Sequence, residues 1–245
     1  MKHGEYVYCF IEGRVDKTFD LKGVGGHGDV YFINYEGITA AISDVPFTIL
    51  EPSRENALAH EKIIQQLLKY YNLVPCSFGN VFKCKEDINT FITKTYGYLK
   101  DNLEKVRDKM EVGLRVFWKK PVFSEEIETK EIKELRDMLL QKPDAENYYS
   151  KIDLGKMVET QVSRRRQYYS DAIFEHLAKY AVEAKLNDTV NPLMVLNASF
   201  LIQNSKEEEF DSQVGAKMKK FEDRLDFSYS GPWPPYNFTS SAPNT

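Results

Sequence analysis

One segment, Leu225-Asp-Phe-Ser-Tyr-Ser-Gly-Pro-Trp-Pro-Pro-Tyr-Asn-Phe238, runs from a strand-like pattern directly into three prolines around a tryptophan. Its first residues alternate between apolar and polar side chains, which is the period of a β-strand. Gly231-Pro232 then removes a backbone donor and restricts the residue ahead of the proline. The strand therefore cannot continue in the middle of a sheet. Packing against the same domain or against a partner must hold Trp233, Tyr236 and Phe238 in place.

The composition indicates a folded protein without a bias toward nucleic acid. At 245 residues, 42% of them hydrophobic, the chain can build one large domain or two small ones. Acidic and basic residues are interspersed, and the net charge is -4 with a sequence pI near 5.7. A negative net charge does not favour binding to a phosphate backbone. We therefore expect no nucleic-acid partner.

The sequence gives no sign of export, membrane insertion or metal binding. Near the N-terminus, Glu12 and Arg14 interrupt a short apolar run that lacks the cleavage site of a signal peptide. No apolar run reaches the length needed to cross a bilayer. Cys9, Cys76 and Cys84 are odd in number and lack the CxxC spacing of zinc sites. We expect a cytoplasmic protein with no membrane partner, no metal and no other cofactor.

Hydrophobic periodicity predicts strands followed by helices in the first half of the chain. Pro52-Ser53 opens a segment with apolar positions at three- and four-residue steps, which predicts an amphipathic helix. A second helical stripe covers 86–106, and 72–82 between the two helices has an extended pattern. Short runs rich in Tyr, Val, Ile and Phe predict strands over 5–11, 29–35 and 38–45.

The pattern restarts in the second half, where 112–118 alternates as in a new strand. A long helical pattern then runs to about Leu186. Residues 194–202 carry a wholly apolar strand face, which is the clearest strand signal in the chain. Ser205 and Glu208 predict a capping box for one more helix ahead of the terminal strand.

These patterns predict an α+β protein with two domains. Each domain is expected to hold an antiparallel sheet with helices on one face. We expect the N-terminal domain at 1–108, a C-terminal domain with the long helix at 109–238, and a flexible tail at 239–245.

Two short motifs suggest chemistry, but their context argues against both. Gly23-Val-Gly-Gly-His-Gly28 is glycine-rich like a phosphate-binding loop, but it precedes a strand and lacks the ending of a P-loop. We expect a tight turn there, since glycine permits one. His60-Glu61 resembles a zinc protease motif, but Ile64 stands where the second histidine belongs. The sequence also lacks a nucleophile elbow and an outstanding carboxylate pair, so we expect no enzyme.

Three passages carry a resemblance when they are taken together. The first is Gly37-Ile-Thr-Ala-Ala-Ile-Ser-Asp-Val-Pro46, followed by a helix with Ala59-His60-Glu61. The second is Leu73-Val-Pro-Cys-Ser-Phe-Gly-Asn-Val-Phe82, and the third is Ser230-Gly-Pro-Trp-Pro-Pro-Tyr-Asn-Phe238. In this order and spacing they resemble the gas vesicle protein F/L (GvpF/GvpL) family. The likeness covers nearly the whole chain, and the final proline-tryptophan motif is its most specific part.

The resemblance implies a fold and a role. It implies two α+β domains, the first of them ferredoxin-like. It also implies an accessory or minor structural role in gas vesicle nucleation and assembly, with binding to the small hydrophobic shell protein and to other accessory proteins. No enzyme activity or cofactor comes with it. In the family the middle motif usually looks like Pro-x-Arg-Phe-Gly, and Ser77 replaces that arginine here, so any contact that the arginine makes in relatives is lost or moved.

A protein that handles a very apolar shell subunit needs apolar or aromatic surface for it. The candidates lie in two segments, one in each expected domain. They are Phe78, Val81, Phe82, Trp233, Pro234, Pro235, Tyr236 and Phe238. Either segment can instead be internal packing, with the C-terminal one a lid over the protein's own core.

Two functions from other classes stay open at this point. A ferredoxin-like sheet can stack bases on surface aromatics, so a single-stranded RNA-binding module is one alternative. The negative net charge and the lack of an RNP-like strand argue against it. An enzyme with a site between the two domains is the other, and a cleft with strongly perturbed titratable groups would identify it.

Overall fold

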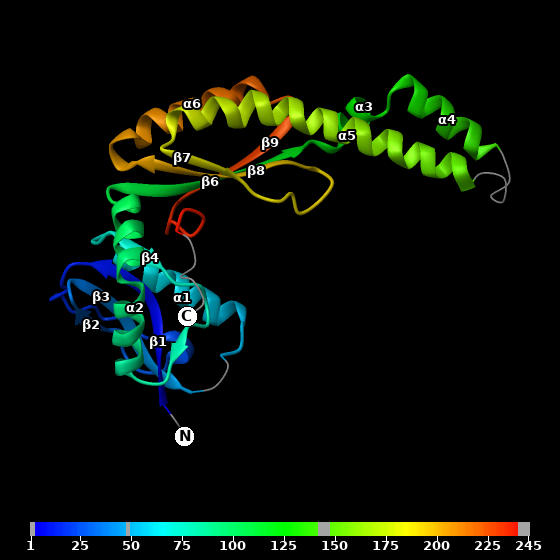
Figure 1. Cartoon of the computed structure of the whole chain (residues 1–245). Coiled ribbons are helices and arrows are strands. Elements are labelled where there is room, and N and C mark those ends of the chain that lie inside the picture. Colours follow the sequence, from blue (N-terminus) through cyan, green and yellow to red (C-terminus); the bar gives the residue numbers. More distant parts are fainter. Residues whose placement is uncertain (1–2, 48–49, 142–147, 240–245) are drawn as a thin grey trace. The chain divides into compact units, whose positions relative to one another are not determined.

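The structure, a computed structural model, describes residues 3–47, 50–141 and 148–239. The chain forms two compact units, whose elements are labelled in Figure 1. Unit 1 runs to Glu111 and also takes in the residues from Pro232 onward, and unit 2 is Val112–Gly231. The chain has two antiparallel sheets together with helices, so it is an α+β protein, as predicted.

Unit 1 is built on a sheet that, among the described residues, has five strands and is packed against two α-helices. The strands lie in the order β2-β3-β1-β4, and β5 pairs with β1 on the edge that β4 also uses. The elements of unit 1 in chain order are β1 (His3–Glu12), β2 (Tyr31–Tyr35), β3 (Ile38–Pro46), α1 (Arg54–Leu68), β4 (Leu73–Pro75), β5 (Val81–Phe82) and α2 (Lys85–Val106).

Each face of the unit 1 sheet is covered by a helix. Tyr6 and Tyr8 of β1 pack in the cluster that contains the buried residues of α1, whereas Val7 and Phe10 pack in the cluster that contains those of α2. A β-bulge between Val7 and Cys9 shifts the register against β3. The expectation of helices on one face is therefore wrong for unit 1, because β1 is apolar on both faces.

The strand order also corrects the ferredoxin-like fold that the resemblance implied for the N-terminal domain. That fold has the order βαββαβ. In unit 1, no α-helix lies between the described residues of β1, β2 and β3, and α1 follows β3. Glu36 and Gly37 connect β2 to β3 with φ of 47° and 79°, as in the tight turns of β-hairpins. A two-residue turn leaves no room for a crossover helix.

Unit 2 has the βαββαβ order instead. Its strands lie in the order β7-β8-β6-β9, so β6 and β8 are central and each crossover passes through helices. This is the arrangement of a ferredoxin-like sheet, with α3 and α4 added to the first crossover. The elements in chain order are β6 (Lys109–Trp118), α3 (Lys120–Ile127), α4 (Lys130–Leu140), α5 (Tyr148–Leu177), β7 (Glu183–Leu186), β8 (Met194–Gln203), α6 (Glu207–Lys220) and β9 (Leu225–Trp233).

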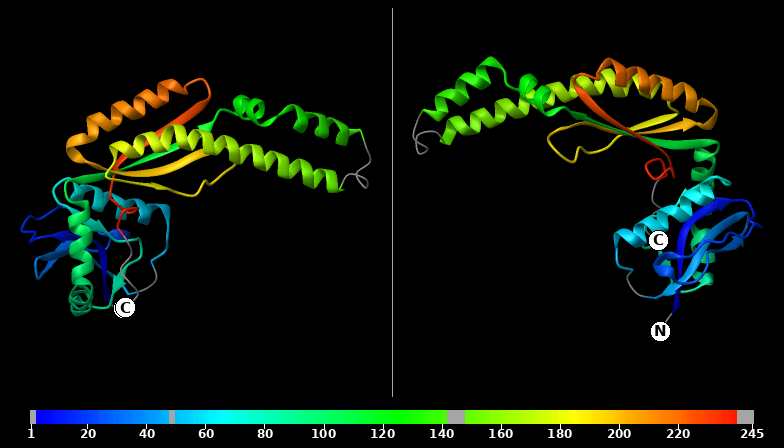
Figure 2. Two further views of the ribbon diagram at one scale, coloured as in Figure 1. Left: turned by 45° about the horizontal axis from the view of Figure 1, so that its top comes forward. Right: turned by 180° about the vertical axis from the view of Figure 1, so that it is seen from behind.

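In unit 2, α5 and α6 lie on the same face of the sheet, as both views in Figure 2 show. Phe200 of β8 joins them, since its ring centre lies 5.7 Å from that of Phe174 in α5 and 5.2 Å from that of Phe210 in α6. The N-terminal half of α5 packs beside α4, and this helical pair extends past the sheet (Figure 1). Unit 2 therefore has the helices on one face that the sequence predicts.

A buried carboxylate ties α3 to the rest of unit 2. Glu126 in α3 is 6% exposed. It accepts hydrogen bonds from Trp118 Nε1 at 3.1 Å, Tyr169 Oη at 2.5 Å and Arg224 Nη1 at 2.6 Å. The three donors come from β6, from α5 and from the turn before β9, so one side chain connects four segments.

The long helix ends earlier than predicted. α5 stops at Leu177, and 183–186 is the strand β7 rather than the last turn of the helix. Glu, Ala, Lys and Leu are strong helix formers. The antiparallel pairing of β7 with β8, from Glu183↔Leu201 onward, outweighs this local preference.

The predicted capping box at Ser205 and Glu208 is wrong. Ser205 lies in a 3₁₀ turn, Asn204–Lys206, and α6 begins at Glu207 without a side-chain cap. Three glutamates lie in the first turn of α6 instead. Their negative charge meets the positive end of the helix dipole and stabilises this helix start.

The glycine-rich segment forms the tight turn that the sequence predicts. Gly25, Gly26 and Gly28 have φ of 72°, 72° and 62°, a region that glycine adopts without strain. Gly23 is needed for another reason. A Cβ atom there would lie 2.5 Å from Ser43 Oγ, so the turn packs directly onto β3.

The two compact units differ from the expected domains in two segments, the first of which is 109–111, which belongs to unit 1. The expected C-terminal domain spans 109–238, whereas the described residues 232–239 belong to unit 1. Hydrogen bonds from Tyr236 and Asn237 to residues of unit 1 account for this. The expected tail at 239–245 lies outside the described residues apart from Thr239. None of the helices in the described part of the chain is long and apolar enough to cross a membrane.

Candidate partner-binding surface

The two segments singled out in the sequence meet around one histidine of unit 1. Phe78, Val81 and Tyr236 all pack against the hydrophobic cluster beneath α1. The ring centres of Phe78 and His60 lie 5.8 Å apart, and Tyr236 Oη lies 3.3 Å from His60 Nε2. We call these four side chains, together with Glu61, the His60 surface.

His60 is held in the core by both of its ring nitrogens. Its side chain comes from the middle of α1, and the residue is 3% exposed. Nδ1 lies 2.9 Å from Tyr6 Oη, and Nε2 lies 3.1 Å from the carbonyl oxygen of Cys76. Burial lowers the pKa of His60 to about 4, although the hydrogen bond to Cys76 opposes this. At neutral pH His60 is therefore an uncharged hydrogen-bonding centre.

Tyr236 links the C-terminal segment to α1. Its hydroxyl donates to Glu61 Oε2 at 3.2 Å. Burial is the largest cause that raises the pKa of both the Tyr236 hydroxyl and the Glu61 carboxyl. The next residue, Asn237, donates its backbone N–H and its side-chain amide to Glu111 at 2.9 and 2.5 Å. Two adjacent residues thus fix this segment on unit 1.

The structure brings together only part of the predicted set. Phe82 packs on the other face of the unit 1 sheet, in the cluster beneath α2. Pro234, Pro235 and Phe238 are buried, and Phe238 is 2% exposed. Trp233 is 36% exposed. A partner can therefore reach Trp233 and the half-buried rings of the His60 surface, but not the whole predicted set.

Ser77 lies in the turn that carries Phe78. The carbonyl oxygen of Ser77 accepts from Asn80 Nδ2 at 2.8 Å. Gly79 has φ of 95° and donates its N–H to Tyr6 Oη at 3.1 Å. Hydrogen bonds from the backbone of Ser77 and Gly79 to the side chains of Asn80 and Tyr6 thus hold this turn without an arginine at position 77.

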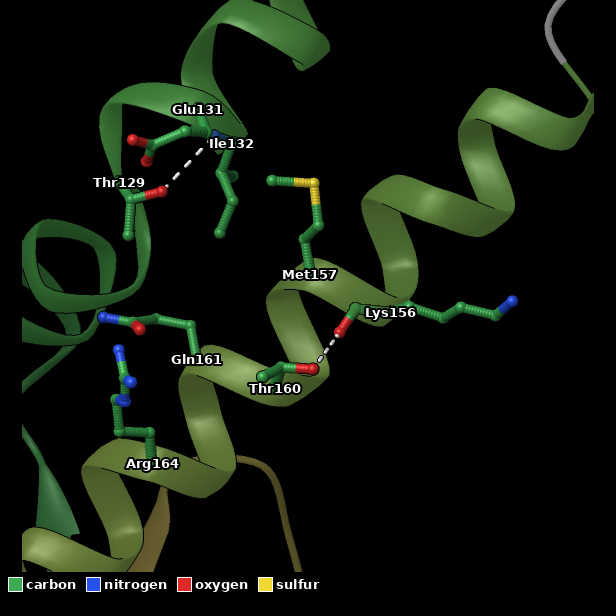
Figure 3. Close-up of a pocket in the computed structure, with 8 residues that line it drawn as sticks. All are labelled: Thr129, Glu131, Ile132, Lys156, Met157, Thr160, Gln161 and Arg164. Atoms are coloured by element: carbon green, nitrogen blue, oxygen red, sulfur yellow. Dashed lines mark hydrogen bonds between the residues drawn. The ribbon is translucent and has the colours of Figure 1, made fainter.

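A cavity of about 350 Å³ lies in unit 2 between α4 and α5 (Figure 3). Its hydroxyls are used locally, because Thr129 Oγ1 accepts from the N–H of Ile132 at 3.3 Å and Thr160 Oγ1 donates to the carbonyl oxygen of Lys156 at 2.8 Å. Hydrogen bonds from its own N–H and from Thr129 lower the pKa of Glu131. The acidic and basic side chains of the lining do not converge, because Lys156 points away from Glu131 (Figure 3), so the described lining residues offer no acid and base positioned together. They are Thr129, Glu131, Ile132, Lys156, Met157, Thr160, Gln161 and Arg164.

The described residues provide neither a cluster of metal ligands nor an activated thiol at Cys9 or Cys76. Within 3–47, 50–141 and 148–239, no group of at least three His, Cys, Asp or Glu side chains could hold a metal ion. Cys9 is buried, and burial raises the pKa of the Cys76 thiol to about 12. A thiol that stays protonated is a poor nucleophile. Cys84 directly precedes α2.

A second apolar surface, which was not predicted from the sequence, lies at the end of the α4–α5 pair. Five large side chains there are between 39% and 79% exposed. The sequence carries a sign of this surface, because these large apolar residues lie off the buried stripe of their helices. In α4 that stripe includes Ile132 and Leu139. We call this set the α4–α5 tip; it comprises Met138, Leu140, Tyr148, Tyr149 and Ile152.

Comparisons with known proteins give one consistent result. The chain matches the family model described as "Gas vesicle synthesis protein GvpL/GvpF" over residues 4–240. It is 30% identical over 244 residues to gas vesicle protein F from Dolichospermum flosaquae, with 95% of this chain and 96% of that protein covered.

Two crystal structures have a similar fold. GvpF from Anabaena sp. PCC7120 superposes with a TM-score of 0.84 at 26% identity, covering 97% of this chain and 98% of the other. GvpF from Microcystis aeruginosa superposes with a TM-score of 0.82 at 26% identity, covering 97% and 99%. The similarity therefore extends over both units.

Proposed function

Because this chain belongs to the GvpL/GvpF family of gas vesicle proteins, we propose that it binds the hydrophobic shell protein and other accessory proteins during vesicle nucleation and assembly. The family match from residue 4 to residue 240 is the observation that carries this proposal. The proposed role is binding without catalysis, and it is exercised in the cytoplasm at the forming vesicle.

The His60 surface supports this role because its aromatic side chains are fixed before a partner arrives. Tyr236 is tied to Glu61 and His60, and Phe78 packs against the His60 ring. A rigid ring loses little conformational entropy when it becomes part of an interface. Trp233, three residues before Tyr236, adds a partly exposed indole. Trp and Tyr are the residue types that most often anchor protein interfaces.

The surroundings of Tyr236 suit an apolar partner. Burial raises the pKa of Glu61 even though Tyr236 and Gln65 donate hydrogen bonds to it. A carboxyl group with this shift is poorly hydrated, so covering it further costs less than covering a fully hydrated charge. An apolar shell subunit can therefore dock beside Glu61 without bringing a countercharge.

Alanine variants at Trp233 and Tyr236 test this assignment. The expected result is that Trp233→Ala and Tyr236→Ala each weaken copurification with coexpressed shell protein about fivefold or more, as for a central interface aromatic. Tyr236→Phe keeps the ring and should retain most of the binding. Tyr70→Ala is the matched control, because Tyr70 is a 57% exposed tyrosine elsewhere in unit 1.

Circular dichroism must show that each variant folds like the unmodified protein. If both alanine variants then copurify with the shell protein at unchanged yield, the His60 surface and Trp233 are not the binding site. The α4–α5 tip would become the next surface to substitute.

A further inference from the structure

β7 forms an edge of the unit 2 sheet. In the strand order of the described residues, β7 pairs with β8 and no strand follows it on its other side. Such an edge presents backbone N–H and C=O groups with which another strand can pair. Its last residue, Leu186, is 50% exposed.

The pairing with β8 fixes which backbone groups point to this edge. The N–H of Asn187 donates to the carbonyl oxygen of Asn197 at 2.8 Å, in line with the register Leu186↔Ala198. Backbone groups of successive strand residues point to opposite sides. The odd-numbered residues of β7 therefore bond to β8, and the N–H and C=O groups of Ala184 and Leu186 point to the free edge. The alternation stops ahead of β7, where the N–H of Val182 also donates to β8, at 2.8 Å to the carbonyl oxygen of Leu201.

The register also fixes the face on which each side chain lies. Ala184 and Leu186 stand opposite Phe200 and Ala198, on the face that the helices cover. Glu183 and Lys185 lie on the other face. The segment Glu183-Ala184-Lys185 thus reads acidic, small, basic about Ala184.

We propose that two copies of this chain pair through β7, antiparallel, about a two-fold axis at Ala184. The two Ala184 residues then exchange both of their outward backbone hydrogen bonds. Glu183 of each copy faces Lys185 of the other in a pair without backbone hydrogen bonds, where side chains are closest. The two sheets become one continuous sheet.

The charges select this register over its neighbours. An axis at Lys185 would place the two lysines opposite each other, and an axis at Glu183 would do the same with the two glutamates. Like charges directly opposite each other destabilise a strand pair. Charged side chains on an edge strand discourage pairing with unrelated strands. Here the same charges discourage foreign strands and wrong registers but allow the two-fold pair.

The proposed dimer is weak and reversible. β7 has four residues, so the pair buries far less surface than the roughly 1,600 Å² of a standard interface. Association should therefore depend on protein concentration. The pairing does not depend on shell-protein binding, and the two proposals can fail separately.

Sedimentation velocity of the purified full-length chain from about 5 to 300 µM tests the pairing. The weight-average mass of the unmodified protein should rise toward that of a dimer. Lys185→Glu and Glu183→Lys each place like charges opposite each other and should weaken association at least tenfold. The double variant Glu183→Lys with Lys185→Glu restores opposite charges and should recover most of it. Ala184→Pro removes an N–H that faces the edge and should also abolish association.

Lys219→Glu is the matched control, because Lys219 is exposed on α6 and the change in net charge equals that of Lys185→Glu. Circular dichroism should show the same helix and strand content in every variant. A mass that stays monomeric over the whole range overturns the proposal. So does a double variant that remains as weak as the single ones, or a Lys219→Glu variant that weakens association equally.

Discussion

Replacing Glu126 with alanine should destabilise unit 2 more than replacing any of its exposed acidic residues with alanine. The carboxylate is 4% exposed as a side chain and receives hydrogen bonds from three donors. Trp118 and Tyr169 are themselves 2% and 1% exposed, so water cannot replace the lost acceptor. Arg224 differs, because its side chain is 52% exposed and can be solvated.

The magnitude follows from these exposures. Each buried donor left without a partner costs about 1–3 kcal/mol, and Glu126→Ala leaves two of them. Relief from burying a charge offsets part of this, so we expect a loss of about 3 kcal/mol in the free energy of unfolding. A loss of this size is a large part of the stability of a typical domain. Glu126→Gln keeps one acceptor oxygen and the volume of the side chain, and should lose roughly half as much.

Urea unfolding followed by tryptophan fluorescence measures this effect. The chain has two tryptophans, Trp118 and Trp233, so a Trp233→Phe background leaves Trp118 in unit 2 as the reporter. Glu125→Ala is the control, since Glu125 is the exposed neighbour on the same helix and should change stability by less than about 0.5 kcal/mol. If Glu126→Ala loses less than about 1 kcal/mol relative to this control, the carboxylate does not hold the four segments together.

Two further predictions concern unit 1. The pKa of His60 is about 4 in the folded chain and near 6.5 when unfolded, so the unfolded chain binds the proton first as pH falls. The contribution of His60 to the free energy of unfolding should be fully present above about pH 6.5 and fall by roughly 2–3 kcal/mol toward pH 4. Glu61 has the opposite effect, because its raised pKa makes the folded state bind more protons than the unfolded state as pH falls. Urea unfolding from pH 7 to pH 4.5 should therefore show a smaller loss of stability in His60→Gln, and an equal loss would rule out His60 as the cause. Gly23→Ala should lower the free energy of unfolding by about 1–3 kcal/mol, because its Cβ would lie 2.5 Å from Ser43 Oγ. Gly97→Ala in α2 is the control, because its Cβ meets no atom within 4 Å and should raise the melting temperature. Equal melting temperatures for the two variants would contradict this prediction.

The strands and helices with one strong periodic face could be predicted from the sequence. β8 carries its apolar face from Met194 to Ile202, and α2 starts and ends within one residue of the predicted 86–106. In both elements burial selects the side chains, so the periodicity records the tertiary structure. In unit 1 the periodicity did not predict on which faces of the sheet the helices lie. β1 is buried on both faces, and a mostly continuous apolar run does not show that a helix lies on each side.

The candidate surface could be predicted only in part. Phe78 and Tyr236 were both singled out, but their common contact with His60 depends on how a distant segment packs on α1. The proline-rich segment has no hydrophobic period, so its sequence does not indicate which ring is buried. Phe238 proves to be buried and Trp233 partly exposed, for reasons that only the packing reveals.

The missed strand β7 shows why some edge strands look helical in sequence. An edge strand is protected from unwanted pairing by charged residues, and Glu and Lys are also strong helix formers. The charges of Glu183 and Lys185 protect the edge, and the high helix propensity of the same two residues extends the helical pattern in the sequence past Leu177. In β7 the order of these charges about Ala184 is also what makes the segment complementary to itself. The residues that misled the prediction of secondary structure are thus the ones that set the register of the proposed pair, and exchanging their charges tests that register directly.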